Sequence, residues 1–93
     1  MNKLKNNQNI ENLKPYSFEW RLVQADMRNK LGSEIYESWL KKISFIEEFN
    51  NYILISVPTR FIRDWITSRY LDQILQIIKT YKKDIIRIEF KIV

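Results

Sequence analysis

The chain has 93 residues, of which 45% are hydrophobic and 29% are charged, so it is long enough for one small domain with its own core. It contains no cysteine, which excludes disulfides and thiolate nucleophiles, and no histidine, which removes the usual zinc ligand and the usual acid–base group near neutral pH. The net charge of +5 suits a nucleic acid, an acidic protein surface or an anionic lipid, and does not choose among them.

The first 15 residues are rich in asparagine and lysine and end at Pro15. Because they lack hydrophobic periodicity, we predict a flexible tail over residues 1–15 and an ordered domain over residues 16–93. The tail lacks the apolar stretch of a secretory signal, and no run in the chain approaches the roughly 20 apolar residues that span a bilayer. We therefore expect a cytoplasmic protein with no membrane partner.

Two helices joined at Gly32 are predicted next. The first begins near Ser17, which can cap it, and Glu19 falls in its first turn. Spacings of three and four place on one face Trp20, Val23, Met27 and Leu31. Gly32 ends this helix, as glycine often does, and Ser33 can cap the second helix. The apolar face of the second helix is formed by Ile35 or Tyr36, Trp39 and Leu40.

A β-hairpin is predicted after the two helices. Residues 43–49 and 52–57 are rich in β-branched and aromatic side chains, and Asn50 and Asn51 separate them. Asparagine tolerates the left-handed conformations that tight hairpin turns use. In the second strand, alternation places on one face Ile53, Ile55 and Val57.

A long helix over residues 60–81 follows, because Pro58 cannot continue a strand ladder and Thr59 can cap a helix. Its main apolar stripe consists of Ile62, Ile66, Tyr70, Ile74, Ile77 and Tyr81. A second group widens the apolar face: Phe61, Trp65, Leu71, Leu75 and Ile78. Beyond a turn at residues 82–84, alternation predicts a half-buried strand whose apolar face is Ile86, Ile88, Phe90 and Ile92.

The predicted element order is α-α-β-β-α-β. We therefore expect an α+β fold in which a three-stranded sheet packs against helices on one face. If the last strand is parallel to a neighbour, the crossover through the long helix should be right-handed.

No pattern in the sequence points to catalysis. The single glycine cannot build a glycine-rich phosphate loop, and no serine or lysine stands in a recognisable nucleophile setting. The adjacent carboxylates Glu47 and Glu48 lie near the predicted hairpin turn, where a solvated turn explains them better than a catalytic pair. We therefore expect no catalytic residue, cofactor site or metal site, and a protein that is not an enzyme.

Large aromatic side chains are the main candidates for a binding surface. Trp39 and Trp65 are expected to face the core, because Trp65 neighbours the apolar stripe of the long helix. Phe61 lies at the edge of that stripe, one turn into the helix, and is the better candidate for exposure. Trp20 is expected to be partly exposed at the start of the first helix. Exposed aromatics are favoured anchors of protein interfaces.

Basic residues occupy both ends of the long helix. A cation near a helix start opposes the helix dipole, so some of these three arginines are expected to serve a partner: Arg60, Arg63 and Arg69. The lysines at the other end of the helix are Lys79, Lys82 and Lys83. Their charges interact favourably with the helix dipole, and this is the preferred interpretation. The alternative interpretation is weak contact with a nucleic acid.

These residues together form a recognisable pattern. Trp20 is followed by Trp39 and Leu40, and an apolar strand then leads into the segment VPTRFIRDWITSRYLDQI at residues 57–74. The Pro-x-x-Phe-x-x-Asp-Trp element and the Tyr-Leu-x-x-Ile element within this segment carry most of the specificity. The pattern resembles the N-terminal domain (domain I) of DnaA, the bacterial chromosomal replication initiator, over roughly residues 18–93.

The resemblance implies a KH-like fold with the same element order and a function in protein docking. The family's partners are the initiator itself, the replicative helicase DnaB and regulatory proteins of initiation. By this resemblance, Trp20 matches a residue of the self-association surface, and Phe61 matches a residue of the helicase contact. An acidic residue of that contact falls on Ile35 in this chain, between Glu34 and Glu37.

Alternatives to a docking domain within an initiator stay open. The 93 residues do not include the linker, ATP-binding module and helix-turn-helix of DnaA, so the chain is either a piece of an initiator or a free-standing domain that regulates initiation. A KH-like domain that binds single-stranded nucleic acid is a further alternative, although only Gly32 is available for the Gly-x-x-Gly loop of KH domains, and weak binding is expected at most. The third alternative is an interaction domain that has no role in replication.

Overall fold

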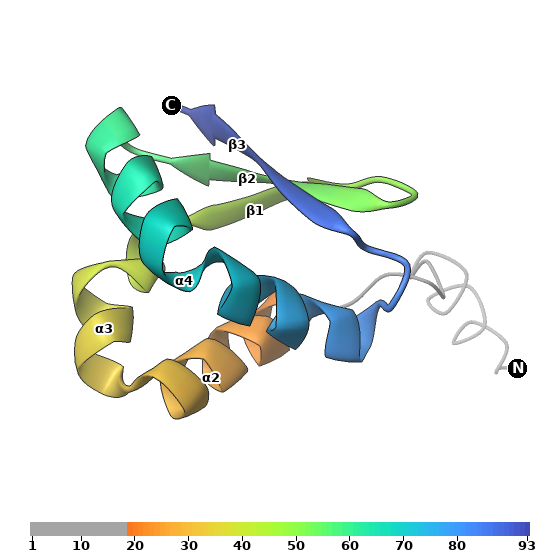
Figure 1. The fold of residues 1–93 in the computed structure, drawn as a ribbon, viewed down its shortest axis with the longest axis horizontal. Helices are drawn as coiled ribbons and strands as arrows, with labels where there is room; N and C mark the ends of the chain where they lie inside the picture. The colour runs from red at the N-terminus through yellow and green to blue at the C-terminus, as the bar shows by residue number, and fades with distance from the viewer. Residues whose placement is uncertain (1–18) are drawn as a thin grey trace, which may run out of the picture.

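The structure, a computed structural model, describes residues 19–93 (Figure 1). The predicted tail over residues 1–15 and the predicted cap Ser17 lie outside the described residues. The elements in chain order are α2 (Trp20–Leu31), α3 (Ser33–Ser38), the 3-10 turn η1 (Leu40–Lys42), β1 (Ser44–Glu48), β2 (Tyr52–Val57), α4 (Arg60–Tyr81) and β3 (Arg87–Ile92). This order confirms the predicted α-α-β-β-α-β arrangement and the α+β class.

The three strands form one sheet in the order β1-β2-β3. β1 and β2 pair antiparallel, whereas β2 and β3 pair parallel, with α4 as the crossover between them. Figure 1 shows α2, α3 and α4 together on one side of the sheet, as predicted. The central strand supplies the buried side chains of the sheet, which are Ile53, Ile55 and Val57. The core therefore lies between β2 and the helices.

The two N-terminal helices keep the predicted face but differ from the prediction at their ends. Val23 and Met27 are buried, and Gly32 follows α2 with a φ of 97°, a value that favours glycine. Gly32 is also the residue that precedes α3, so Ser33 is the first residue of that helix and makes no capping hydrogen bond. Glu19 is the residue before α2 rather than part of its first turn. The predicted roles of Ser33 and Glu19 were therefore wrong, because Gly32 joins the two helices directly and α2 begins only at Trp20.

The hairpin is where predicted, and its turn is closed by the Phe49 N–H, which donates to the Tyr52 carbonyl at 2.8 Å. Neither Asn50 nor Asn51 has a positive φ, so the left-handed turn expected of them does not occur. The register of β1 against β2 shifts at Ile46, and this bulge leaves the Ile46 side chain exposed.

α4 begins and ends at the predicted residues. The Thr59 hydroxyl accepts a hydrogen bond from the Ile62 N–H at 3.1 Å, which confirms the cap. The buried side chains of the helix are Ile66, Ile74, Ile77 and Ile78. Its last residue, Tyr81, is exposed and donates a hydrogen bond to the Asp26 carboxylate of α2. That bond raises the pKa of the Tyr81 hydroxyl, because the neutral phenol is the donor.

The predicted alternation starts at Ile86, but β3 begins one residue later, at Arg87. Ile86 lies outside β3 and is 56% exposed, whereas Ile85 is fully buried. The Ile85 N–H bonds to the Lys82 carbonyl and the Ile86 N–H to the Asn51 carbonyl. The chain is therefore still turning at these residues, which directs Ile85 into the core and Ile86 outward.

Candidate functional site

Four aromatic side chains form a continuous surface cluster where α3 ends and α4 begins. The Trp39 and Trp65 rings stack with centroids 3.6 Å apart and planes at 8°. The ring centroids of Phe61 and Trp39 are 6.1 Å apart, and those of Tyr70 and Trp65 are 5.5 Å apart. We call these four residues, Trp39, Phe61, Trp65 and Tyr70, the aromatic patch.

Local structure explains why these rings meet. Trp39 leaves the helical conformation at the end of α3, with φ −129° and ψ −54°, while its N–H still bonds to the Ile35 carbonyl at 2.9 Å. Phe61 and Trp65 lie one turn apart on α4, so they share a helix face. The Thr59 cap fixes the start of this helix, and with it the position of Phe61.

Phe61 is the exposed member of the patch. Its side chain is 69% exposed, as predicted, and it is the most exposed aromatic among residues 19–93. Trp65 is half-buried and packs against the core cluster, in agreement with its predicted direction. Trp39 was predicted as core, but it is only half-buried, because one of its neighbours is the exposed Phe61 ring.

A shallow hollow of about 450 Å³ opens beside Phe61. It is lined by Phe61, Asp64, Trp65, Ser68 and Arg69. Phe61, Trp65 and Arg69 are each four residues from the next, and this spacing in the sequence predicts that they share a helix face. The position of Arg69 beside Trp65 was missed because charge alone groups it with the other arginines.

Cations lie over the indole rings of the patch. The Arg69 guanidinium lies 4.7 Å from the Trp65 ring centre, and the Lys42 amino group lies 5.8 Å from the Trp39 ring centre. Both distances are in the range of cation–π attraction. The surface is therefore aromatic and positively charged at the same time.

Not all predicted contact residues on α4 are equally available. Arg63 forms an ion pair with the neighbouring Asp64 at 3.0 Å and is half-buried. Arg60 is exposed and makes no ion pair within residues 19–93. Of the two arginines flanking Phe61, Arg60 is thus the freer one.

The three predicted residues of α3 have three different environments. Glu37 pairs with Arg28 of α2 and with Lys41, and these hydrogen bonds lower the pKa of its carboxyl group. Ile35 is half-buried and packs against the core cluster. Glu34 is exposed. The ring contact between this part of the chain and α4 is made by Trp39, the residue that follows α3.

Trp20 lies apart from the aromatic patch, at the start of α2. Its ring stacks on Phe45 of β1 with centroids 5.7 Å apart, and the side chain is half-buried, in line with the predicted partial exposure. Its indole N–H is buried and has no hydrogen-bond partner among the described residues. Leu22, close by in the same helix, is exposed.

The three lysines near the end of α4 do not form one surface. The Lys82 amino group lies 2.9 Å from the Glu48 carboxylate of β1, and the two side chains are only 15% and 10% exposed. Lys83 is exposed and Lys79 is half-buried. The structure thus assigns Lys82 to a contact between α4 and the hairpin, which leaves little of its charge for a nucleic acid.

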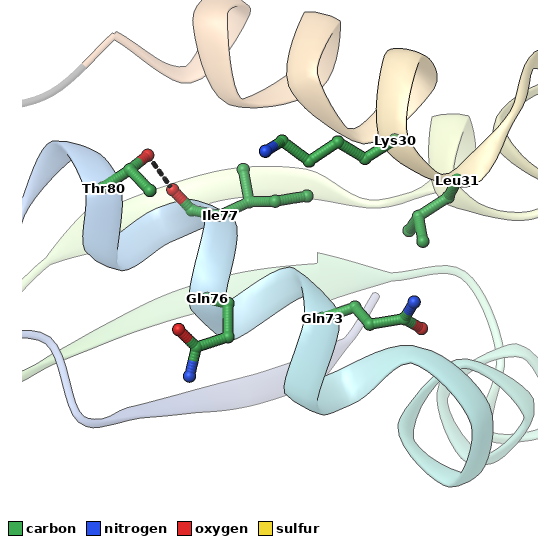
Figure 2. A pocket seen from close by; sticks show the side chains of 6 residues that line it. All are labelled: Lys30, Leu31, Gln73, Gln76, Ile77 and Thr80. Atoms are coloured by element: carbon green, nitrogen blue, oxygen red, sulfur yellow. Dashed lines mark hydrogen bonds between the residues drawn. The ribbon is translucent and has the colours of Figure 1, made fainter.

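A second hollow, of about 360 Å³, lies between α2 and α4 (Figure 2). Figure 2 shows the Lys30 side chain reaching along it, and the Thr80 hydroxyl donates to the Ile77 carbonyl at its edge. The remaining lining residues are Leu31, Gln73 and Gln76. One lysine without a carboxylate offers no acid–base pair, so this hollow does not suggest a reaction.

Within residues 19–93, no group of three or more acidic side chains is arranged to hold a metal ion. None of the described helices is both long enough and apolar enough to cross a membrane.

Comparison with known proteins gives one consistent match. Residues 19–80 match the family model of the DnaA N-terminal domain. Chromosomal replication initiator proteins DnaA from Rickettsia massiliae and Rickettsia rickettsii are 41% identical to the chain over 70 residues, and the protein of that name from Rickettsia canadensis is 40% identical. Each alignment covers 75% of this chain and 15% of the relative. The chain thus spans a small part of the length of these relatives.

Proposed function

The chain belongs to the DnaA N-terminal domain family, and on that premise we propose that it is a protein-docking module of bacterial chromosomal replication initiation. In this proposal it takes part in self-association of the initiator and contacts the replicative helicase or regulators of initiation, in the cytoplasm and without catalysis. The observation that carries the proposal is the exposure of Phe61 on a base of two stacked tryptophans.

The aromatic patch has the properties of an interface anchor. A large ring that is 69% exposed loses much apolar surface to water when a partner covers it, and this favours association. The Thr59 cap and the Trp39–Trp65 stack hold Phe61 in place before a partner arrives, so little conformational entropy is lost on binding.

The residues of the proposed helicase contact differ in their exposure and in whether they already have an ion-pair partner. Phe61 and Arg60 are exposed and are the main contacts in this proposal. Glu34 is the exposed acidic residue nearest to the family's acidic position, which is Ile35 here. Arg63 and Glu37 already have ion-pair partners within the chain, so we assign them supporting roles.

A different surface, around Trp20, is proposed for self-association. The half-buried indole and the exposed Leu22 give α2 apolar area that a second copy can cover. Trp20→Leu, which keeps an apolar side chain beside Phe45, should lower the sedimentation coefficient at high concentration relative to the wild type. Wild-type protein that stays monomeric at every concentration would remove this role.

Two other functions compete with docking inside an initiator. A free-standing copy of the domain would bind the same partners and act as a regulator of initiation. Weak binding of single-stranded nucleic acid through Lys79 and Lys83 is the other, and the high net charge favours it. Because Lys82 is held by Glu48, we rank this function below protein docking.

The proposed helicase contact is tested by calorimetric titration of the chain into the replicative helicase. Phe61→Ala should weaken binding at least tenfold, in the range of an interface hot spot. Ile86→Ala is the matched control, because Ile86 is also exposed and apolar but lies just before β3, away from the aromatic patch. Equal affinities of Phe61→Ala and wild-type protein would reject Phe61 as the contact.

A further inference from the structure

Three cations around the aromatic patch have no carboxylate partner among residues 19–93, and these are Lys42, Arg60 and Arg69. Lys42 and Arg69 lie over the rings of Trp39 and Trp65. Arg60 is exposed and precedes Phe61 in the chain. Two of these charges thus lie on the aromatic patch itself, and the third is next to Phe61 in the sequence.

Two carboxylates near the patch, those of Asp64 and Glu37, are already paired with cations of the same chain. Asp64 is the acidic residue that lines the hollow, and its carboxylate is paired with Arg63 at 3.0 Å. Glu37 on α3 is paired with Arg28 and Lys41. Unpaired cations therefore remain at the patch while Asp64 and Glu37 are compensated, and the exposed Glu34 of α3 is one carboxylate against three such cations, so the charge balance there is positive.

We infer that the partner presents an acidic surface to this patch, with an apolar side chain that enters the hollow beside Phe61. This inference rests on the proposed docking function and adds the chemistry of the partner. The Arg69 guanidinium donates one hydrogen bond to the Ser68 hydroxyl, at 3.4 Å, and lies over the Trp65 ring. Its remaining N–H groups can therefore donate to a carboxylate of a partner.

A nucleic acid also carries negative charge, but Phe61 is the one ring of the patch that is largely exposed to it. Bases bind such surfaces by stacking on free aromatic faces. The Trp65 ring is covered by Trp39 and by Arg69, and Trp39 is in turn contacted by Phe61 and Lys42. A base could stack on Phe61 alone, whereas at Trp39 and Trp65 it would have to displace existing ring and cation contacts, so we favour a protein side chain in the hollow.

The test measures association and dissociation rates with the replicative helicase at low and at physiological salt. Lys42→Glu combined with Arg69→Glu should slow association about tenfold at low salt, with a smaller effect at high salt. Arg60→Glu should act in the same direction, and Arg60 is exposed and makes no ion pair within residues 19–93. The matched control is Lys30→Glu combined with Lys91→Glu, which changes the net charge equally at exposed positions away from the patch.

The outcomes separate this inference from the proposed function. If the charge reversals associate as fast as the wild type while Phe61→Ala still weakens binding, the acidic partner is rejected and the docking function stands. If Phe61→Ala binds like the wild type, the docking function is rejected. If the charge reversals abolish binding of a labelled oligothymidine but leave helicase binding unchanged, the cations serve a nucleic acid and the inference is overturned.

A pair of peptides tests the partner chemistry independently of the helicase. One peptide has a central leucine flanked by glutamates, and the other has the same leucine flanked by lysines. We expect the acidic peptide to shift the Trp65 indole and Arg69 signals in an NMR titration and the basic peptide to leave them unchanged. Equal shifts with both peptides, or none with either, would contradict the inference.

Discussion

The indole rings of Trp39 and Trp65 stack with centroids 3.6 Å apart and planes at 8°, and this contact joins the end of α3 to the start of α4. Phe61 rests against the outer part of this stack. The two tryptophans therefore join two helices, and in the proposed function the exposed phenylalanine contacts the partner. The proposal thus assigns stability and recognition to neighbouring rings.

This proposal predicts that two similar substitutions change the free energy of unfolding by very different amounts. Trp65→Ala removes the stack and a half-buried ring, so we expect the free energy of unfolding to fall by about 2 kcal/mol or more. Phe61→Ala removes a ring that is mostly in water, and we expect a change of about 0.5 kcal/mol at most. Urea denaturation of both variants measures the difference, and a larger loss for Phe61→Ala would show that its ring is part of the core.

The Glu37 ion pairs predict a dependence of stability on pH. Hydrogen bonds from Arg28 and Lys41 lower the pKa of Glu37 in the folded chain below its ordinary value of 4.5. The stabilisation is therefore complete above about pH 4.5 and is lost as the pH falls through the lower pKa of the folded state.

Denaturation at neutral and at acidic pH tests this assignment. The wild type should lose more stability on acidification than Glu37→Gln, which cannot titrate at this position. Glu34→Gln is the matched control, because Glu34 is exposed on the same helix, and it should follow the wild type. Parallel pH profiles for the wild type and Glu37→Gln would show that the ion pairs contribute nothing.

The lysines at the end of α4 predict a third contrast. Lys82 pairs with Glu48 at a site where both side chains are at most 15% exposed, so Lys82→Ala leaves a carboxylate with little water around it. We expect it to lower the free energy of unfolding by about 2 kcal/mol, less than for a fully buried pair. Lys83→Ala, at an exposed position next to it, should change stability by about 0.5 kcal/mol at most. Thermal unfolding of both variants checks this, and equal melting temperatures would contradict a structural role for Lys82.

Much of the fold could be predicted from local signals. Pro58 and Thr59 mark the boundary between β2 and α4, and the isoleucines of α4 repeat at helical spacing over the whole helix. The exposure of Phe61 followed from its place at the edge of that stripe. These signals are local, so one segment of sequence is enough to read them.

Contacts between distant segments could not be predicted in this way. The stack of Trp39 on Trp65 and the pairing of Lys82 with Glu48 depend on how α3, α4 and the hairpin are placed in space. No periodicity within a single element records such placement. Sequence periodicity therefore indicated that Trp65 points inward, but not which residue covers it.

The central claim, that the aromatic patch is the docking surface, is tested most directly by the indole N–H signals of the three tryptophans in an NMR titration with the replicative helicase. Trp39 and Trp65 lie in the patch, whereas Trp20 stacks on Phe45 elsewhere. We expect the signals of Trp39 and Trp65 to shift or broaden at low helicase concentration while that of Trp20 does not change. A response of Trp20 alone, with Trp39 and Trp65 unaffected, would contradict the claim.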